Sequence, residues 1–199
     1  MQLHNITDSV ATNIILRREA RVFFVWNTSK EIQFTVSGAG AEAHIFALFV
    51  GKQEDHLSFT VKQTHRAPKT RSHLHTLALL GGSSRIEYRG EIHMEPSAEN
   101  ADASQENRNI LLSKDAHALS EPVIEILSDS GTARHGSTTA GAEGDALMLL
   151  ELRGIDKTAG TRVLAEGAVR NFFDTMRKLT DDPLIDTYEQ TALTHLADV

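Results

Sequence analysis

Residues 45–61 read IFALFVGKQEDHLSFTV, and this stretch contains the two signals that decide the fold. Six apolar residues, 45–50, precede Gly51 and a polar turn, after which Leu57, Phe59 and Val61 alternate with polar residues. Alternation with a period of two places one face of a strand in a core and the other in water. The stretch therefore predicts two short β-strands joined by a turn.

The same pattern continues on both sides of this stretch. Turn-forming residues separate the segments, as at 38–40, 81–84 and 128–131. Many short strands at regular spacing predict an all-β body that reaches about residue 140. The spacing alone leaves a sandwich, a barrel and a β-helix open. The further strand-like segments are 22–26, 32–36, 77–79, 86–88, 92–94, 110–112 and 124–126.

Two parts of this body differ in composition. Residues 1–20 are polar apart from a short apolar group at 14–16, and we expect an N-terminal lead-in or an edge strand there. Residues 96–108 are small, polar and acidic, which predicts a long exposed loop.

Beyond Gly144 the pattern becomes helical. Asp145 can cap a first helix that ends near Gly154, because glycine tolerates the left-handed conformation of a C-terminal cap. A second helix is predicted over about 156–179, where apolar residues recur every three or four positions, and a third over 184–196. The expected organisation is a lead-in (1–20), a β core (21–143) and a C-terminal helical subdomain (144–199).

Composition excludes several classes of protein. The 199 residues include 20 Lys and Arg, 27 Asp and Glu and no Cys, for a formal net charge of −7. An acidic chain lacks the clustered cations that bind nucleic acid, so we expect no nucleic-acid partner. The longest apolar run is far shorter than the roughly 18 residues that span a bilayer. No signal peptide is visible, so we expect no membrane partner and a cytoplasmic location.

No catalytic motif emerges from the chain. Of the ten histidines, His73 and His75 are two residues apart and share one face of a predicted strand, so they form a candidate metal-ligand pair without a third ligand. Ser137, His135 and Asp129 lie close in sequence, but no GxSxG motif accompanies them. The glycine-rich turns complete neither a P-loop nor a dinucleotide fingerprint. We therefore expect a protein that is not an enzyme.

Several short motifs resemble, in order and spacing, the SufB/SufD family of scaffold subunits of the Suf iron-sulfur cluster assembly machinery. The resemblance covers about residues 60–180. It rests on 111–113 (LLS), 121–126 (EPVIEI), 133–138 (ARHGST), 149–155 (LLELRGI) and the upstream segment 84–90 (SRIEYRG).

The resemblance implies a mainly β fold, a right-handed parallel β-helix with a C-terminal α-helical subdomain. It implies a non-catalytic subunit that pairs through its β-helix as a homodimer or as a heterodimer with a SufB/SufD-type subunit. It also implies that the C-terminal helices dock a SufC-like ABC ATPase. By the same resemblance, Leu149, Arg153, Gly154 and Ile155 are the expected partner-binding residues.

The chain departs from the family where cluster-related cysteines stand, with Asn107 at one such position and Ala133 at the other. No cofactor can therefore be bound through cysteine, and thiolate capture of iron or sulfide by this chain is excluded. His135 remains, and it can contribute one imidazole to an iron-sulfur site shared with a partner. The alternative function is a stand-alone β-helical interaction protein that has lost cluster-assembly chemistry.

Overall fold

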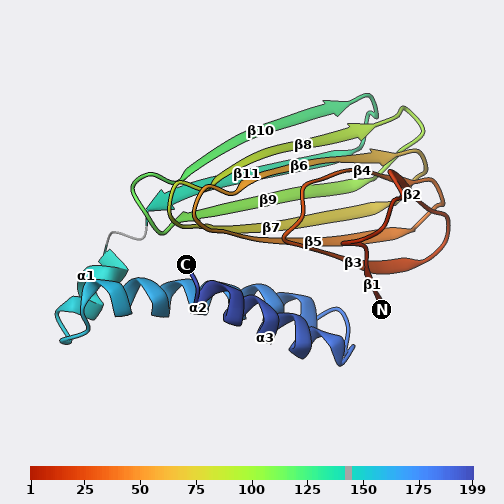
Figure 1. Cartoon of the computed structure of the whole chain (residues 1–199). Helices are drawn as coiled ribbons and strands as arrows, with labels where there is room; N and C mark the ends of the chain where they lie inside the picture. Colours follow the sequence, from red (N-terminus) through yellow and green to blue (C-terminus); the bar gives the residue numbers. More distant parts are fainter. Residues whose placement is uncertain (142–144) are drawn as a thin grey trace.

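The computed structural model describes residues 1–141 and 145–199, which form eleven strands followed by three helices (Figure 1). The expected boundary between residues 143 and 144 lies outside the described residues. No helix within the described residues is both long and apolar enough to span a membrane.

Successive strands alternate between two parallel sheets. The odd-numbered strands form sheet A, in the order β1-β3-β5-β7-β9-β11, and the even-numbered strands form sheet B, in the order β10-β8-β6-β4-β2. Because each strand passes to the opposite sheet before the chain returns, the strands wind into a solenoid. The predicted parallel β-helix is confirmed. Sheet A contains β1 (Gln2–Asn5), β3 (Ala20–Trp26), β5 (Glu42–Gly51), β7 (Arg71–Leu80), β9 (Asp102–Leu111) and β11 (Thr132–Gly141), and sheet B contains β2 (Asn13–Leu16), β4 (Lys30–Val36), β6 (His56–His65), β8 (Arg85–Met94) and β10 (His117–Ile126).

The N-terminal segment contributes to both sheets. β1 pairs with β3 and β2 pairs with β4, and each is the first edge strand of its sheet. Of the two alternatives for residues 1–20, a lead-in or an edge strand, the structure shows edge strands, one in each sheet.

The register stacks equivalent residues from coil to coil. In sheet A, Ile45 pairs with Leu74, Leu74 with Gln105, and Gln105 with His135, so these four side chains form one inward-facing column. The column begins apolar and ends polar. No strict sequence repeat marks these coils because the stacked residues differ in chemistry.

A hydrophobic core fills the space between the sheets. The rings of Phe23 and Phe34 lie 5.0 Å apart, and those of Phe49 and Phe59 lie 5.3 Å apart, all buried. The other face of sheet A is also covered, because α2 and α3 pack on it (Figure 1). Since β5 is buried on both faces, residues 45–50 form a continuous apolar run rather than an alternating one.

The prediction of an exposed loop over residues 96–108 is confirmed only for 96–101, which connect β8 to β9, and is wrong for 102–108. Residues 102–111 form β9, whose inward side chains include Gln105, Asn107 and Asn109, all buried. These polar side chains are hydrogen-bonded inside the solenoid, as when Asn107 Nδ2 donates to Ser120 Oγ at 2.7 Å. A strand whose buried residues are polar and small carries no hydrophobic alternation, so the pattern missed it.

A buried histidine anchors the polar part of the interior. Thr70 Oγ1 donates to the carbonyl of Ala67 at 2.9 Å, so its oxygen accepts from His65 Nδ1 at 2.7 Å. The neutral ring then accepts at Nε2 from Ser72 Oγ, also at 2.7 Å. Burial, with a smaller contribution from His73, lowers the pKa of His65 to about 4. The interior therefore holds this imidazole in its neutral form.

The chain of hydrogen bonds continues across both sheets in one direction. Tyr88 donates to Gln105 Oε1 at 3.2 Å, and Gln105 Nε2 donates to Gln63 Oε1 at 2.8 Å. Gln63 Nε2 then donates to Ser72 Oγ at 2.7 Å, which joins this chain to His65. This series of hydrogen bonds links sheet A to sheet B, and it gives each of these buried polar side chains a hydrogen-bond partner.

The C-terminal helical subdomain contains α1 (Asp145–Glu151), α2 (Lys157–Arg177) and α3 (Leu184–Leu196). The predicted second and third helices agree with α2 and α3 to within two residues, and Asp145 lies in the first turn of α1. Asp156 caps α2 by accepting from the amide of Ala159 at 2.9 Å. The apolar stripe of α2, including Phe172 and Phe173, packs on the outer face of sheet A together with α3.

Candidate functional site

The expected partner-binding segment ends α1 in a defined turn. The amide of Ile155 donates to the carbonyl of Leu150 at 3.1 Å, and that of Gly154 donates to Glu151 at 2.9 Å. This pair of bonds is the Schellman motif, which needs a left-handed residue after the helix. Gly154 supplies it with φ +83°. The sequence RGI at 153–155 therefore sets the geometry of this turn.

One side of α1 packs against α2 and the other faces solvent. Leu147 is buried, and a Cβ added at Gly160 of α2 would lie 2.6 Å from its Cδ1, so this glycine allows the two helices to approach closely. Met148 is 53% exposed, Leu149 49% and Leu152 75%. We call these three residues the α1 apolar face. Clustered exposed apolar side chains are typical of a protein interaction surface.

The predicted partner-binding residues occupy different positions in this segment. Leu149 lies on the α1 apolar face, Arg153 and Gly154 are exposed, and Ile155 is half-buried. Leu152 lies within the expected docking segment 149–155, whereas Met148 lies one residue before it. Their apolar character was visible in the sequence, but their exposure follows from the packing of Leu147 on α2.

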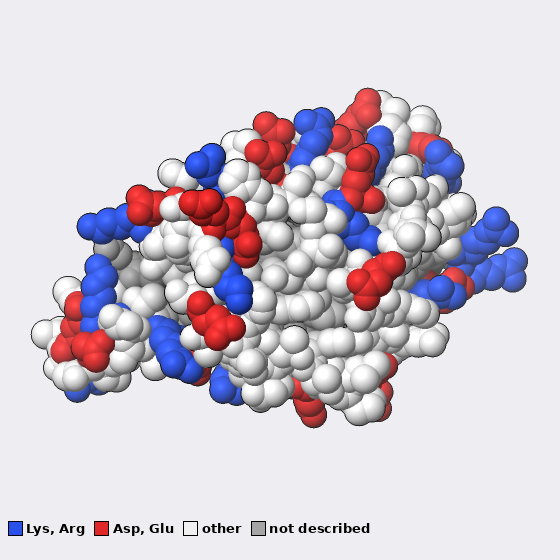
Figure 2. All heavy atoms as spheres, viewed as in Figure 1, with Lys and Arg blue, Asp and Glu red and all other residues white. Residues whose placement is uncertain are grey.

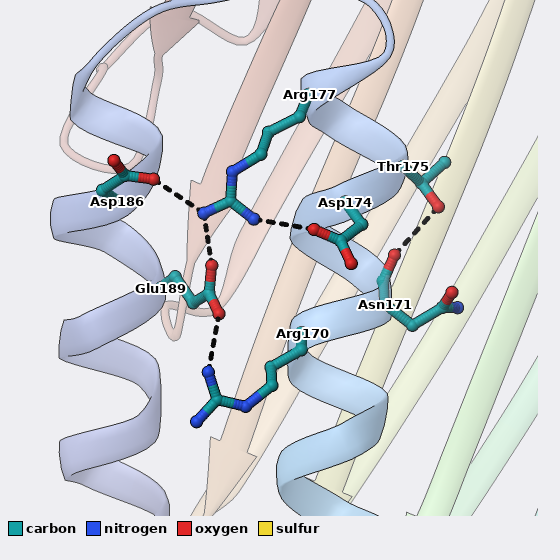
Figure 3. A network of polar contacts seen from close by, with 7 residues as sticks. All are labelled: Arg170, Asn171, Asp174, Thr175, Arg177, Asp186 and Glu189. Atoms are coloured by element: carbon teal, nitrogen blue, oxygen red, sulfur yellow. Dashed lines mark hydrogen bonds and ion pairs between the residues drawn. The ribbon is translucent and has the colours of Figure 1, made fainter.

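An ion-pair network holds α2 against α3 (Figure 3). Arg177 pairs with Asp174 at 3.0 Å, with Asp186 at 2.7 Å and with Glu189, which is almost fully buried. Arg170 approaches Glu189 at 3.5 Å from the same helix. The hydrogen bonds that Arg177 donates to Asp186 and Glu189 raise the pKa of its guanidinium further above the usual range. The network holds α2 in place against α3, and α1 in turn packs against α2 through Leu147 and Gly160.

The second candidate region is the open end of the solenoid. β10 and β11 are the last strands of their sheets, so each leaves one edge unpaired within the described residues. Ile126 pairs with the buried Met94 but is itself 40% exposed, which shows that the interior of the last coil is open to solvent. Leu119 and Val123 are also exposed on β10. Such an edge is a template for pairing with another chain.

His135 lies at this open end. It is exposed on β11 and faces inward in register with Gln105. Close to it lie the two positions at which the resemblance places cysteines of the family. Ala133 is two residues earlier on the same face of the strand, and the buried Asn107 pairs with the neighbouring Ser137. The structure thus brings together all three positions that the resemblance singled out.

The described residues do not form a metal site by themselves. Within 1–141 and 145–199, no group of three or more His, Cys, Asp or Glu side chains is arranged to hold a metal ion. The residues present therefore do not fit an iron-sulfur cluster ligated by this chain alone.

The histidine pair of β7 is engaged in other contacts. His73 Nδ1 lies 2.8 Å from Ser104 Oγ, and His75 Nδ1 lies 3.1 Å from Glu106 Oε2. His73 also contacts the ring of His44 at a centroid distance of 5.3 Å, and burial lowers the pKa of both. These contacts favour hydrogen-bonded imidazoles over a metal-ligand pair.

The residues of the hydrolase hypothesis do not form a triad. His135 and Ser137 are neighbours on β11, whereas Asp129 lies in the turn before this strand. None of the three is hydrogen-bonded to another in the part of the chain that the structure describes. The geometry therefore offers no activated nucleophile.

Charged side chains of both signs are mixed on the face shown in Figure 2, mainly along the rims of the solenoid and around α1. The middle of this face is largely uncharged.

Comparisons with known proteins agree with these features. Residues 10–168 match the family described as SUF system FeS cluster assembly, SufBD core domain. A SufBD family protein of Mycobacterium leprae is 30% identical over 151 residues, 72% of this chain and 38% of that protein. SufB of Bacillus subtilis is 23% identical over 137 residues, 69% of this chain and 30% of that protein.

A chloroplastic SufBD family protein of Arabidopsis thaliana is 27% identical over 121 residues, 61% of this chain and 21% of that protein. The chain therefore spans well under half the length of these relatives.

Proposed function

The chain belongs to the SufBD family of iron-sulfur cluster assembly proteins, and we propose that it is a non-catalytic subunit of a cytoplasmic Suf-type assembly complex. In this proposal its C-terminal helices dock a SufC-like ABC ATPase, and its β-helix pairs with a second SufB/SufD-type chain. The observation that carries the proposal is the pair of exposed surfaces at α1 and at the open end of the solenoid.

The α1 apolar face supports the docking of the ATPase. Met148 and Leu149 lie on α1 and Leu152 in the turn that follows it. Leu147 packs this helix against α2, and the Schellman turn fixes its end. A rigid apolar face loses little conformational entropy on binding, which favours association. Arg153 adds a cation at the rim of this face.

The open end supports pairing with a second chain. A partner strand placed along β10 or β11 would satisfy the unpaired backbone groups and cover the inward-facing Ile126. Along β10, its outward side chains would lie beside Leu119 and Val123, which are on the outer face of sheet B. The homodimer and the heterodimer bury the same surface, and the partner's sequence decides between them.

The cluster is cargo of the complex in this proposal. His135 supplies one imidazole at the paired open ends, and a cysteine-bearing partner supplies the thiolates. Anaerobic reconstitution with such a partner is expected to give a cluster whose yield falls in His135→Ala and not in His117→Ala, an exposed histidine of β10. An unchanged yield in His135→Ala would contradict the ligand role.

Point variants test the two surfaces separately. Leu149→Asp together with Leu152→Asp is expected to weaken binding of the SufC-like ATPase at least tenfold in a calorimetric titration, with chain pairing unchanged. Leu119→Asp on β10 is the matched control and is expected to weaken pairing, measured by light scattering, with ATPase binding unchanged. Unchanged ATPase affinity in the α1 double variant would overturn the docking surface.

The alternative function is a stand-alone β-helical interaction protein without cluster chemistry. The absence of cysteine favours it. Failure of the wild-type chain to bind either the ATPase or a cysteine-bearing subunit would support this alternative and contradict the Suf-type complex.

A further inference from the structure

A pocket of about 170 Å³ lies between α2 and the outer face of sheet A, away from both surfaces described above. Its floor is apolar and is built by Phe46, Leu77 and Phe172. The rings of Phe46 and Phe172 meet edge to face at 5.5 Å, so this floor is rigid. The size resembles that of an engineered apolar cavity of about 150 Å³ that holds a benzene molecule.

Polar groups stand around the rim of this pocket. The imidazole of His75 stacks on Phe46 at a centroid distance of 5.1 Å and contacts Glu106 at 3.1 Å. Arg108, two residues beyond Glu106 on the same face of β9, also lines the pocket. Its guanidinium makes no hydrogen bond or ion pair with any residue of 1–141 or 145–199.

The helix side of the rim carries a second group without a polar partner. Figure 3 shows the side chain of Asn171 extending from α2 on the side away from α3, over the strands. Its backbone carbonyl accepts from Thr175 Oγ1 at 2.9 Å, while its side-chain amide has no hydrogen-bond partner among the described residues. A guanidinium and an amide therefore flank one apolar depression.

We propose that this pocket binds a small monocarboxylate with an apolar body of about the size of a benzene ring. The apolar body would lie on the floor of Phe46, Leu77 and Phe172. The carboxylate would take a bidentate pair of hydrogen bonds from Arg108, with Asn171 as a further donor. A concave apolar site with a few convergent polar groups is the usual form of a small-molecule site.

The charges at the rim restrict the ligand further. A carboxylate that pairs with Arg108 offsets the repulsion from Glu106, whereas a second carboxylate would meet this repulsion with no further Lys or Arg of the described residues lining the pocket. A neutral amide of the same shape would lose the charge-assisted bonds to the guanidinium, which are about twice as strong as neutral ones. The pocket should therefore prefer a monocarboxylate over both a dicarboxylate and an amide.

The test uses the full chain and three probes, namely benzoate, benzamide and phthalate. Residue-resolved NMR titration is expected to show saturable benzoate shifts at Phe46, Leu77 and Ala168, with benzamide and phthalate binding at least tenfold more weakly. Arg108→Gln and Asn171→Ala change exposed side chains and leave the core intact. Arg108→Gln is expected to weaken benzoate binding at least tenfold, and Asn171→Ala by a smaller factor.

Arg85→Gln is the matched control, because Arg85 is an exposed arginine of sheet B with no side-chain partner among the described residues. It should leave benzoate binding unchanged. Equal binding of benzoate and benzamide, unchanged affinity in Arg108→Gln, or shifts that do not saturate would each overturn the proposal. The titration needs no partner protein, so its outcome is independent of the proposed role in cluster assembly.

Discussion

Acidification from pH 7.5 to 4.5 is expected to lower the free energy of unfolding by about 2 to 3 kcal/mol through His65 alone. The pKa of His65 is about 4 in the folded protein, against 6.5 for a histidine in the unfolded chain. As the pH falls from 6.5 toward 4, His65 becomes protonated in the unfolded chain but stays neutral in the folded chain. Stability is therefore fully present above about pH 7.5 and is lost toward pH 4.

The magnitude follows from the size of the shift. A difference of one pKa unit corresponds to about 1.36 kcal/mol, and folding lowers the pKa of His65 from 6.5 to about 4. The main cause is burial of the imidazole, with a smaller contribution from His73. The hydrogen bonds to Thr70 and Ser72 agree with the neutral form, because Nε2 accepts from Ser72 Oγ. Burial also lowers the pKa of His44 and of His73, so both histidines add to the loss of stability on acidification.

Urea denaturation at several pH values, followed by circular dichroism and by the fluorescence of the single tryptophan, Trp26, measures this slope. His65→Asn removes the titrating group and is expected to be less stable at pH 7.5 but to lose about 2 to 3 kcal/mol less than wild type on acidification. His56→Asn, at an exposed position of the same strand, should keep the wild-type dependence.

An equal loss of free energy in wild type and His65→Asn would refute the reasoning. A ring proton on Nε2 in the nitrogen NMR spectrum at neutral pH would also refute it, because the hydrogen-bond chain requires the Nδ1 tautomer.

Three other substitutions test separate parts of the structure. Gly154→Ala places a Cβ at φ +83°, which should cost about 1 kcal/mol and speed amide exchange in α1; unchanged exchange would contradict the Schellman turn. Glu189→Gln removes a buried partner of Arg177 and should cost about 1 to 2 kcal/mol in a thermal melt, whereas an unchanged melting temperature would show that the α2–α3 network is dispensable. Lys52→Ala breaks an exposed ion pair with Asp198 and should cost less than about 0.5 kcal/mol by the same measurement; a larger loss would mean that the C-terminus depends on it.

The sequence was most informative where burial is apolar. β5 and the stripe of α2 are strongly patterned because one is buried on both faces and the other along one side. β9 was missed because its inward residues are amides held by hydrogen bonds, and no periodicity of apolar residues reveals a polar interior. The stacking of coils depends on a register between residues about 30 positions apart, which local patterns do not contain.

The candidate site was predicted only where it depends on local sequence, and not where it depends on tertiary contacts. The motif at 149–155 located the exposed end of the helical subdomain, since its glycine and flanking residues define a local turn. The exposure of Met148 and Leu152 depends on how α1 rests against Gly160, which is a tertiary contact. The pocket beneath α2 also joins residues from separate strands and a helix, so only the folded chain brings them together.

Photo-crosslinking from α1 in cells tests the central claim most directly. A photoreactive amino acid in place of Leu152 is expected to form an adduct with a SufC-like ABC ATPase, identified by mass spectrometry. The same amino acid in place of Glu54, exposed in the turn between β5 and β6, should form no such adduct. An absence of ATPase adducts from Leu152, or equal adducts from both positions, would contradict the account of this chain as an ATPase-docking Suf subunit.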